Sequence, residues 1–115
     1  CVAQLASGAL ASASNDTTLR IWDAEAGACT RVLKGHTGTV FCVAQLASGA
    51  LASASSDTTL RIWDAEAGAC TRVLKGHTNS VNCVAQLASG ALASASNDTT
   101  LRIWDAEAGA CTRVL

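Results

Sequence analysis

The sequence CVAQLASGALASAS, which runs from Cys42 to Ser55, also begins at Cys1 and at Cys83. The chain therefore repeats itself with a period of 41 residues, in two complete units (1–41 and 42–82) and a third that covers 83–115. Self-similarity at such a period is typical of proteins that stack one small structural unit on the next. We expect an array of similar units rather than one mixed domain.

Four short segments of each unit have the pattern of β-strands, because apolar and polar side chains alternate or an apolar run is bounded by turns. Their first examples along the chain are Ala9–Ser14, Thr18–Trp22 and Cys29–Leu33, followed by Phe41–Leu46, which runs into the second unit. A period near 40 also fits helix pairs of the armadillo type, and alanine favours helix. However, no segment between turn residues reaches the roughly 10–12 residues of a typical helix. The pattern predicts an all-β chain.

Two motifs recur at a fixed offset. Gly35-His36-Thr37 precedes Trp63-Asp64, and Ser55-Ser56-Asp57 lies between them; the same order recurs in the third unit. In this arrangement the chain resembles the WD-repeat β-propeller family over all 115 residues. The resemblance implies a radial array of four-stranded antiparallel blades.

Carried onto the middle unit, the resemblance places strands at about 39–46, 50–55, 59–64 and 69–75, from the central axis to the rim. It predicts one repeat array over 1–115, with blades at about 1–34, 35–75 and 76–115. Three blades form an incomplete ring, since propellers close with about 4–8 blades.

The resemblance also implies a hydrogen-bonded network within each blade, formed by a histidine, a serine, a turn aspartate and a tryptophan. A buried histidine needs partners for both ring nitrogens, and the tryptophan N–H needs an acceptor. The expected members are His36, Ser53, Asp57 and Trp63 in the second blade, His77, Ser94, Asp98 and Trp104 in the third, and Ser12, Asp16 and Trp22 in the first. The first blade has no histidine, so we expect it to be the least stable. We expect all three tryptophans in the core.

Serine, histidine and aspartate together would also suit a hydrolase. An active site normally occurs once, however, and this set recurs with the repeat; no G-x-S-x-G motif is present. The two histidines lie 41 residues apart and no Cys-x-x-Cys or His-x-x-x-His spacing occurs, which argues against a metal site. No glycine-rich phosphate loop is visible. We therefore expect a non-enzymatic chain with no catalytic residue, metal or cofactor.

Net charge and the length of the apolar runs argue against two classes of partner. Eight Lys and Arg residues face nine Asp and Glu residues, for a net charge of -1. A nucleic-acid surface would need a strong positive excess, and no apolar run approaches the ~18 residues of a membrane helix. We expect neither nucleic acid nor membrane as a partner. Unpaired cysteines and the absence of a signal-like segment favour the cytoplasm.

Each unit carries one cysteine on its first strand (Cys1, Cys42, Cys83) and one on its fourth (Cys29, Cys70, Cys111). These strands would lie three ladder spacings apart, about 14 Å, whereas a disulfide needs Cα atoms within about 7 Å. Disulfides within a blade are therefore excluded. We interpret the cysteines as small buried apolar residues in a reducing compartment.

The units differ at only four positions of the repeat, which lie beside the aspartate turn and at the start of the first strand. In similar proteins this end of the ring carries the partner-binding surface, and loops on a rigid scaffold are common recognition sites. The alternative is that these loop positions merely tolerate change. The residues concerned are Asn15, Ser56 and Asn97, Gly38 and Asn79, Thr39 and Ser80, and Phe41 and Asn82.

The sequence thus predicts a WD-repeat scaffold that binds a protein or peptide. It would form part of a larger propeller, or would close by head-to-tail association with copies of itself through its terminal blades. The alternatives are a structural repeat protein whose function is its own assembly into a ring or filament, and an engineered symmetric propeller without a natural partner. An open helical stack is a further possibility.

Overall fold

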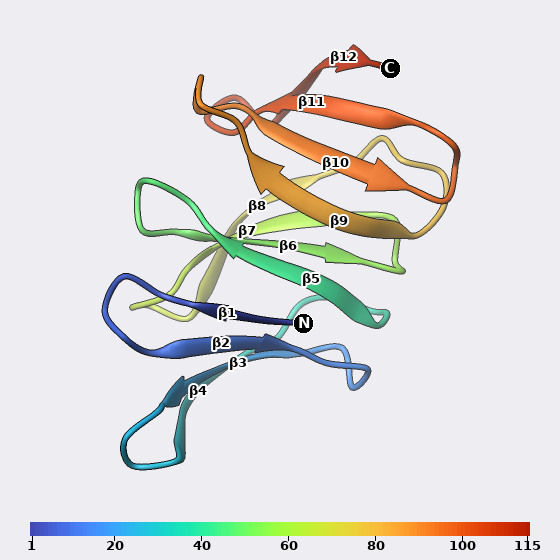
Figure 1. The fold of residues 1–115 in the computed structure, drawn as a ribbon. Helices are drawn as coiled ribbons and strands as arrows, with labels where there is room; N and C mark the ends of the chain where they lie inside the picture. Colours follow the sequence, from blue (N-terminus) through green and yellow to red (C-terminus); the bar gives the residue numbers. More distant parts are fainter.

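The structure, a computed structural model that describes residues 1–115, consists of twelve β-strands and no helix. They form three separate four-stranded sheets in which every neighbouring pair is antiparallel (Figure 1). The expectation of an all-β array of propeller blades is confirmed. We call the sheets blade 1, with β1 (Val2–Gln4), β2 (Leu10–Ala13), β3 (Leu19–Asp23) and β4 (Ala28–Leu33); blade 2, with β5 (Val40–Gln45), β6 (Leu51–Ser55), β7 (Leu60–Asp64) and β8 (Ala69–Leu74); and blade 3, with β9 (Val81–Gln86), β10 (Leu92–Ser96), β11 (Leu101–Asp105) and β12 (Ala110–Val114).

Short turns connect the strands of a blade and fix their register. Between β5 and β6, the amide of Leu46 donates to the carbonyl of Ala50, and Gly49 adopts a φ of 93° that only glycine accepts without strain. Between β7 and β8, one carboxylate oxygen of Asp64 accepts hydrogen bonds from the two amides that follow it in the turn, at 3.0 and 3.1 Å. Each turn therefore comes from the residue types that mark it in the sequence.

The apolar core lies between blades rather than within one. One cluster joins blades 1 and 2 and contains Leu19, Val43 and Trp63. The equivalent cluster joins blades 2 and 3 and contains Leu60, Val84 and Trp104. Because a four-stranded sheet has two faces and no helix to cover either of them, each blade buries its apolar side chains only against a neighbouring blade.

Polar contacts between blades repeat with the same offset. The side chain of Gln45 reaches back from β5 so that its Oε1 accepts from the amide of Ala6 at 2.7 Å, and Gln86 does the same to Ala47 at 2.7 Å. At the rim, an Nη1 of Arg31 donates to the carbonyl of Ala67 at 3.5 Å, and Arg72 repeats this contact in the next joint at 3.3 Å. The two joints between blades are thus built alike.

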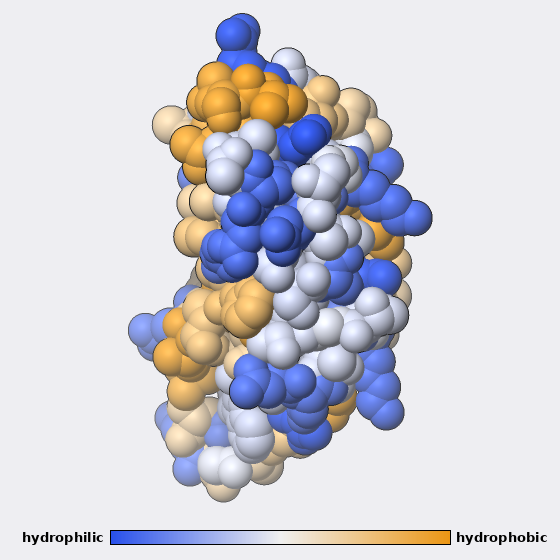
Figure 2. Space-filling model, turned by 90° about the vertical axis from the view of Figure 1, so that its right-hand side faces the viewer, coloured by the Kyte–Doolittle hydropathy of each residue, from blue (hydrophilic) through white to orange (hydrophobic).

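Each terminal blade leaves one face without a neighbouring blade. The leucine that begins the third strand shows this difference between blades. Leu19 of blade 1 and Leu60 of blade 2 are 0% exposed, whereas Leu101 of blade 3 is 47% exposed. Figure 2 shows apolar side chains gathered at the end of the molecule that blade 3 forms. The array is open and measures 42 × 28 × 19 Å.

Since all of its regular elements are strands, the molecule has no helix that could span a membrane.

Candidate functional site

The turn between the second and third strands of each blade organises the predicted network. In blade 2, Asp57 Oδ1 accepts from the amide and the hydroxyl of Thr59 at 3.0 and 2.6 Å. These bonds hold Thr58 at a φ of 76°, a left-handed conformation that is rare for a β-branched residue. The equivalent threonines of blades 1 and 3 have φ values of 76° and 72°. The aspartate is thereby fixed with its second oxygen, Oδ2, free to accept other donors.

In blade 2 the second oxygen faces His36. The Nδ1 atom of His36 lies 2.8 Å from Asp57 Oδ2, and its Nε2 lies 2.6 Å from Ser53 Oγ. The Nε1 atom of Trp63 donates to the same serine oxygen at 2.8 Å. Blade 3 repeats the arrangement, with His77 at 2.7 Å from both Asp98 and Ser94, and Trp104 Nε1 at 2.8 Å from Ser94 Oγ.

Chemistry fixes the direction of these bonds. A carboxylate only accepts, so Nδ1 of His36 carries the proton and donates to Asp57. Burial lowers the pKa of His36, which keeps the ring neutral, and its bare Nε2 accepts from the hydroxyl of Ser53. Although burial alone would raise it, hydrogen bonds from Thr59, His36 and Thr37 lower the pKa of Asp57 to about 2. The hydrogen bonds thus run in one direction, from Trp63 through Ser53 and His36 to the carboxylate.

This order of serine, histidine and aspartate resembles that of a hydrolase, but the serine is inaccessible. Ser53 is 0% exposed, and its oxygen already accepts from the tryptophan. The side chain of His36 is likewise 0% exposed. A nucleophile must reach its substrate, so the arrangement in blade 2 serves to hold the blade together.

Blade 1 has the same residues without a histidine. Trp22 Nε1 donates to Ser12 Oγ at 2.9 Å, and Thr18 donates to Asp16 as Thr59 does to Asp57. The hydroxyl of Thr18 is the main cause of a lowered pKa of Asp16. Trp22 is half-buried, unlike Trp63 and Trp104, which are fully buried. The expectation that all three tryptophans lie in the core is therefore wrong for Trp22, because no blade packs on its side of blade 1.

Within blade 2 and within blade 3, several of the positions at which the units differ contact one another. The amide of Ser56 donates to the carbonyl of Thr39 at 2.9 Å, and a Cβ on Gly38 would collide with Ser56 Oγ. In blade 3, Asn82 and Asn97, which match Phe41 and Ser56 of blade 2, are hydrogen-bonded directly: Asn82 Nδ2 donates to Asn97 Oδ1 at 2.6 Å. We call these positions the variable surface; it consists of Asn15, Gly38, Thr39, Phe41, Ser56, Asn79, Ser80, Asn82 and Asn97.

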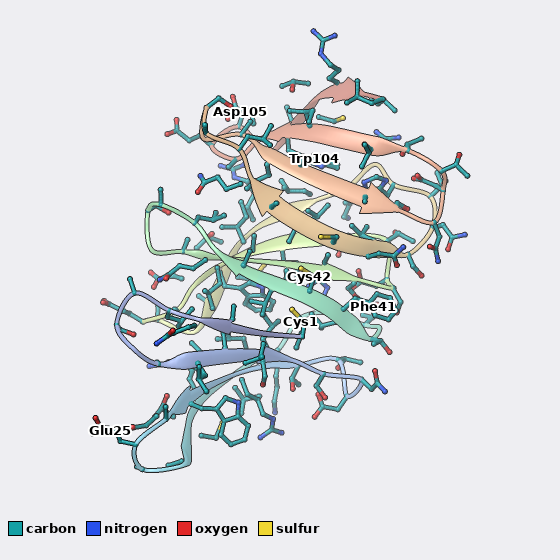
Figure 3. All side chains as sticks on the ribbon, viewed as in Figure 1. Cys1, Glu25, Phe41, Cys42, Trp104 and Asp105 are labelled. Carbon is teal, nitrogen blue, oxygen red and sulfur yellow. The ribbon has the colours of Figure 1, made fainter.

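A bulge presents the central residue of the variable surface. Val40 pairs with Ser55 and Cys42 pairs with Ala54, so Phe41 is an extra residue that has no partner in the ladder. Its side chain is 41% exposed. Bulges turn a side chain away from the regular face of a sheet. Phe41 lies at the opposite end of the blades from Glu25 and Asp105 (Figure 3).

The contacts between variable positions and the bulge could not be found by inspection of single segments. The signal in the sequence is that two positions change together, because the pair Phe41 and Ser56 of blade 2 becomes Asn82 and Asn97 in blade 3. Each pair lies 15 residues apart, across two strands and a turn.

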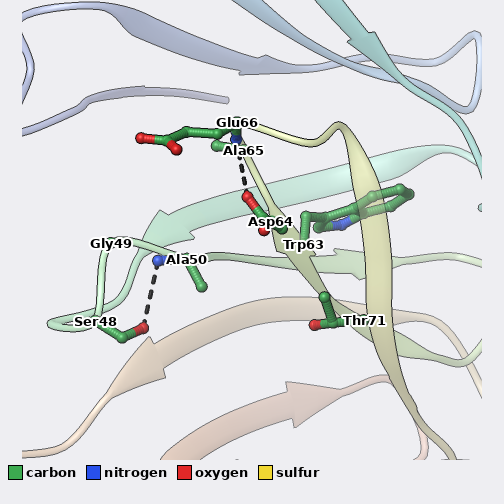
Figure 4. A pocket seen from close by; sticks show the side chains of 8 residues that line it. All are labelled: Ser48, Gly49, Ala50, Trp63, Asp64, Ala65, Glu66 and Thr71. Carbon is green, nitrogen blue, oxygen red and sulfur yellow. Dashed lines mark hydrogen bonds between the residues drawn. The ribbon is translucent and has the colours of Figure 1, made fainter.

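The opposite end of each blade has a hollow of its own. In blade 2 the hollow encloses about 430 Å³ between the turn at Ser48 and the turn at Glu66, with Trp63 and Thr71 beside it (Figure 4). Its polar atoms are mostly used within the protein: Ser48 Oγ accepts from Ala50, and Thr71 donates to the carbonyl of Ile62. The same hollow recurs in the other blades, with the same residue types.

All six cysteines are free. None of them is fully buried, however, so the interpretation as buried apolar residues is wrong. Cys42, for example, is half-buried on the innermost strand, and its thiol lies 3.8 Å from the carbonyl of Val84 in the neighbouring blade. Burial raises the pKa of this thiol. No group of three or more His, Cys, Asp or Glu side chains could hold a metal ion.

The fold and the recurring network define a class of protein, the β-propeller built from WD repeats. The family described as "WD domain, G-beta repeat" matches residues 1–23, 27–64 and 68–105, and the chain belongs to it.

Individual proteins match shorter stretches or share only part of their length. The WD40 β-propeller domain of Doa1, a solved structure, superposes on the whole chain with a TM-score of 0.93 and 26% identity; the chain covers 39% of it. Cell division control protein 4 of Saccharomyces cerevisiae is 54% identical over 33 residues, which are 29% of this chain and 4% of that protein. Nuclear distribution protein PAC1 of Arthroderma benhamiae is 61% identical over 31 residues, which are 27% of this chain and 7% of that protein.

Proposed function

We propose that the chain is a non-enzymatic scaffold that binds protein or peptide partners through the variable surface. WD40 propellers generally bind proteins or peptides, which supports the class of partner. The single observation that carries the proposal is the clustering of differences. The units are identical elsewhere, and in blades 2 and 3 positions that differ contact one another at one end of the blade.

The chemistry of this surface suits a polypeptide. It offers an exposed aromatic ring at Phe41, amides at Asn15, Asn82 and Asn97, and a hydroxyl at Ser56, and it carries no charge. An aromatic anchor surrounded by uncharged hydrogen-bonding groups is typical of protein recognition surfaces. Phosphate-rich partners would instead need Lys or Arg there.

The test selects peptides from a random display library on the 115-residue chain. The selected peptides are then titrated against a variant with Asn15, Phe41, Ser56 and Asn82 all replaced by Ala. A matched control carries Ser48→Ala and Glu66→Ala in the hollow at the opposite end. We expect the first variant to lose at least about tenfold in affinity for most peptides, a difference of about 1.4 kcal/mol. Equal binding to both variants, with folding intact, would refute the proposal.

A second candidate function is head-to-tail association with copies of the same chain, favoured by the open faces of the terminal blades. The face of blade 3 that exposes Leu101 is equivalent to the face of blade 2 that packs Leu60 against blade 3. The face of blade 1 that carries Trp22 is equivalent to the face of blade 2 that packs Trp63 against blade 1. A second copy can therefore repeat the internal joint, and such a contact closes into a ring or continues as a filament.

Sedimentation of the purified chain tests this association. We expect a dimer, trimer or polymer for the natural sequence and a monomer for Leu101→Glu. The variant Phe41→Glu, which places the same charge at another exposed apolar residue, should associate like the natural sequence. A folded monomer of the natural chain at high concentration would end this candidate.

A further inference from the structure

The innermost strands of the blades carry a cysteine at the same position of each unit. Cys42 pairs with Ala54 between β5 and β6, and Cys83 pairs with Ala95 between β9 and β10, so the two thiols start from equivalent places. The strands β1, β5 and β9 lie side by side along the inner edge of the array (Figure 1). Cys1 and Cys42 follow one another along that edge (Figure 3). These cysteines therefore form a row that runs from blade to blade.

The thiols of Cys1 and Cys42 each contact the blade that follows. The Cys42 thiol lies 3.8 Å from the carbonyl oxygen of Val84, which is the residue directly after Cys83. It packs against the apolar cluster between blades 2 and 3. Cys1 makes the same contact with the carbonyl oxygen of Val43 at 4.0 Å. The thiol of one blade thus lies beside the backbone of its counterpart in the next blade.

The two thiols at the joint between blades 2 and 3 are also close to one another. Burial raises the pKa of the Cys42 thiol, and the neighbouring thiol of Cys83 raises it further. The strands β5 and β9 have Cα atoms within 8 Å of one another, near the span of about 4.4–6.8 Å that a disulfide bridges. The first and fourth strands of one blade are instead about 14 Å apart. The spacing that excludes a disulfide within a blade therefore favours one between blades.

Small reagents can reach this pair of thiols. Blade 2 has a neighbouring blade on each side, and Cys42 is nevertheless only half-buried, while Cys83 is exposed. The other cysteines of these two blades, Cys70 and Cys111, lie on the outermost strands β8 and β12, at the opposite edge of each sheet. Because the Cys42 thiol packs toward blade 3 and not toward blade 1, its geometry favours Cys83 as the partner.

We propose that Cys42 and Cys83 form a modification site, at which a small-molecule disulfide such as oxidised glutathione links blade 2 to blade 3. The thiolate of one cysteine attacks the reagent, which releases one thiol and leaves a mixed disulfide on the protein. The thiolate of the other cysteine then attacks the protein sulfur of this bond and releases the second thiol. One disulfide forms and one breaks, and the protons of the two cysteines leave on the two released thiols.

The test incubates the folded chain with oxidised glutathione, blocks the remaining thiols and maps the disulfides by mass spectrometry after digestion with trypsin. Cleavage after Lys and Arg leaves every cysteine in a different peptide, with Cys42 in 35–61 and Cys83 in 76–102. We expect these two peptides to be linked within one chain, at least about tenfold more often than any other pair, because the fold holds their thiols together. The link closes a long loop, so the melting temperature should rise by about 5 °C.

Two variants and one condition serve as controls. Cys83→Ser, a small change at an exposed residue, should abolish both the link and the rise in melting temperature. Cys70→Ser removes a thiol from the outermost strand of blade 2 and should leave both unchanged. The natural chain unfolded in urea should give mixed pairs without this preference. Absence of the link in the folded chain, a link from Cys42 to Cys1 in its place, or the same pairing in the folded and unfolded chains would overturn the proposal.

Discussion

Blade 2 and the two terminal blades have nearly the same sequence but different surroundings. Leu60 and Trp63 of blade 2 are both 0% exposed, one against each neighbour. Blade 3 keeps its tryptophan buried and exposes Leu101, whereas blade 1 keeps Leu19 buried and leaves Trp22 only half-buried. The comparison shows that the contribution of a residue to stability depends on whether a neighbouring blade covers it. Equivalent substitutions in different blades measure that contribution directly.

The largest difference is expected for the leucine at the start of the third strand. Leu60→Ala should lower the free energy of unfolding by about 2–5 kcal/mol, as for a fully buried leucine that leaves a cavity. Leu101→Ala should lower it by less than about 1 kcal/mol, because this side chain is 47% exposed. Urea denaturation of the two variants measures both values. Equal losses would mean that blade 3 is covered in solution, as head-to-tail association requires.

The next difference concerns the turn aspartate. Asp57→Asn turns an amide NH₂ toward the ring of His36 and the amide of Thr37, which leaves buried donors unpaired, and should cost about 2–4 kcal/mol. Asp16→Asn disturbs no histidine and should cost clearly less, because the Asp16 side chain is 52% exposed. Thermal unfolding of both variants tests the comparison. A larger loss for Asp16→Asn would contradict the role assigned to the histidine.

The pH dependence of stability should come mainly from the blades that hold a histidine. Burial lowers the pKa of His36 below its usual value of 6.5, so the unfolded chain takes up a proton first and stability falls as the pH drops below about 6.5. The lowered pKa values of Asp57 and Asp98 remove further stability below about pH 3.8, where their carboxyls protonate in the unfolded chain. A His36→Gln chain should show a shallower decline between about pH 6.5 and 5. An unchanged slope would argue against a neutral His36.

The smallest difference is expected at the rim glycines. Gly27 and Gly68 have φ values of 69° and 70°, so Ala at either position adopts a left-handed conformation at a cost of about 1 kcal/mol. A Cβ at Gly68 also meets the Arg31 side chain at 2.8 Å, whereas nothing lies near Gly27. Gly68→Ala should therefore be less stable than Gly27→Ala by about 0.5 kcal/mol, since the flexible arginine can move. Denaturant titrations of the pair check this order.

The sequence predicted the fold well because the repeat supplied three readings of one pattern. Alternation, turn residues and the Gly-His and Trp-Asp motifs agreed, and the predicted strand at about 50–55 is β6 (Leu51–Ser55) in the structure. Alanine-rich strands run against intrinsic helix propensity. They form because each small side chain lets the neighbouring sheet approach, as at Ala52 and Ala54, which are both 0% exposed.

The surroundings of individual residues were harder to predict. Trp22 has the same local sequence as Trp63, so no local signal separates the half-buried tryptophan from the fully buried one. The cysteines lie on strands whose faces are only partly covered, which their spacing does not reveal. The bulge at Phe41 depends on how Val40 and Cys42 pair with β6, which is a property of the sheet and not of one segment.

The joints between blades join residues a constant number of positions apart: 39 for the glutamine contacts and 36 for the arginine contacts. A gene that gains or loses 41 codons therefore keeps every remaining joint intact, whereas a shift by one codon inside a unit breaks the offset on both sides. The fold thus tolerates changes of length in whole units, and no contact between neighbouring blades depends on the total number of units.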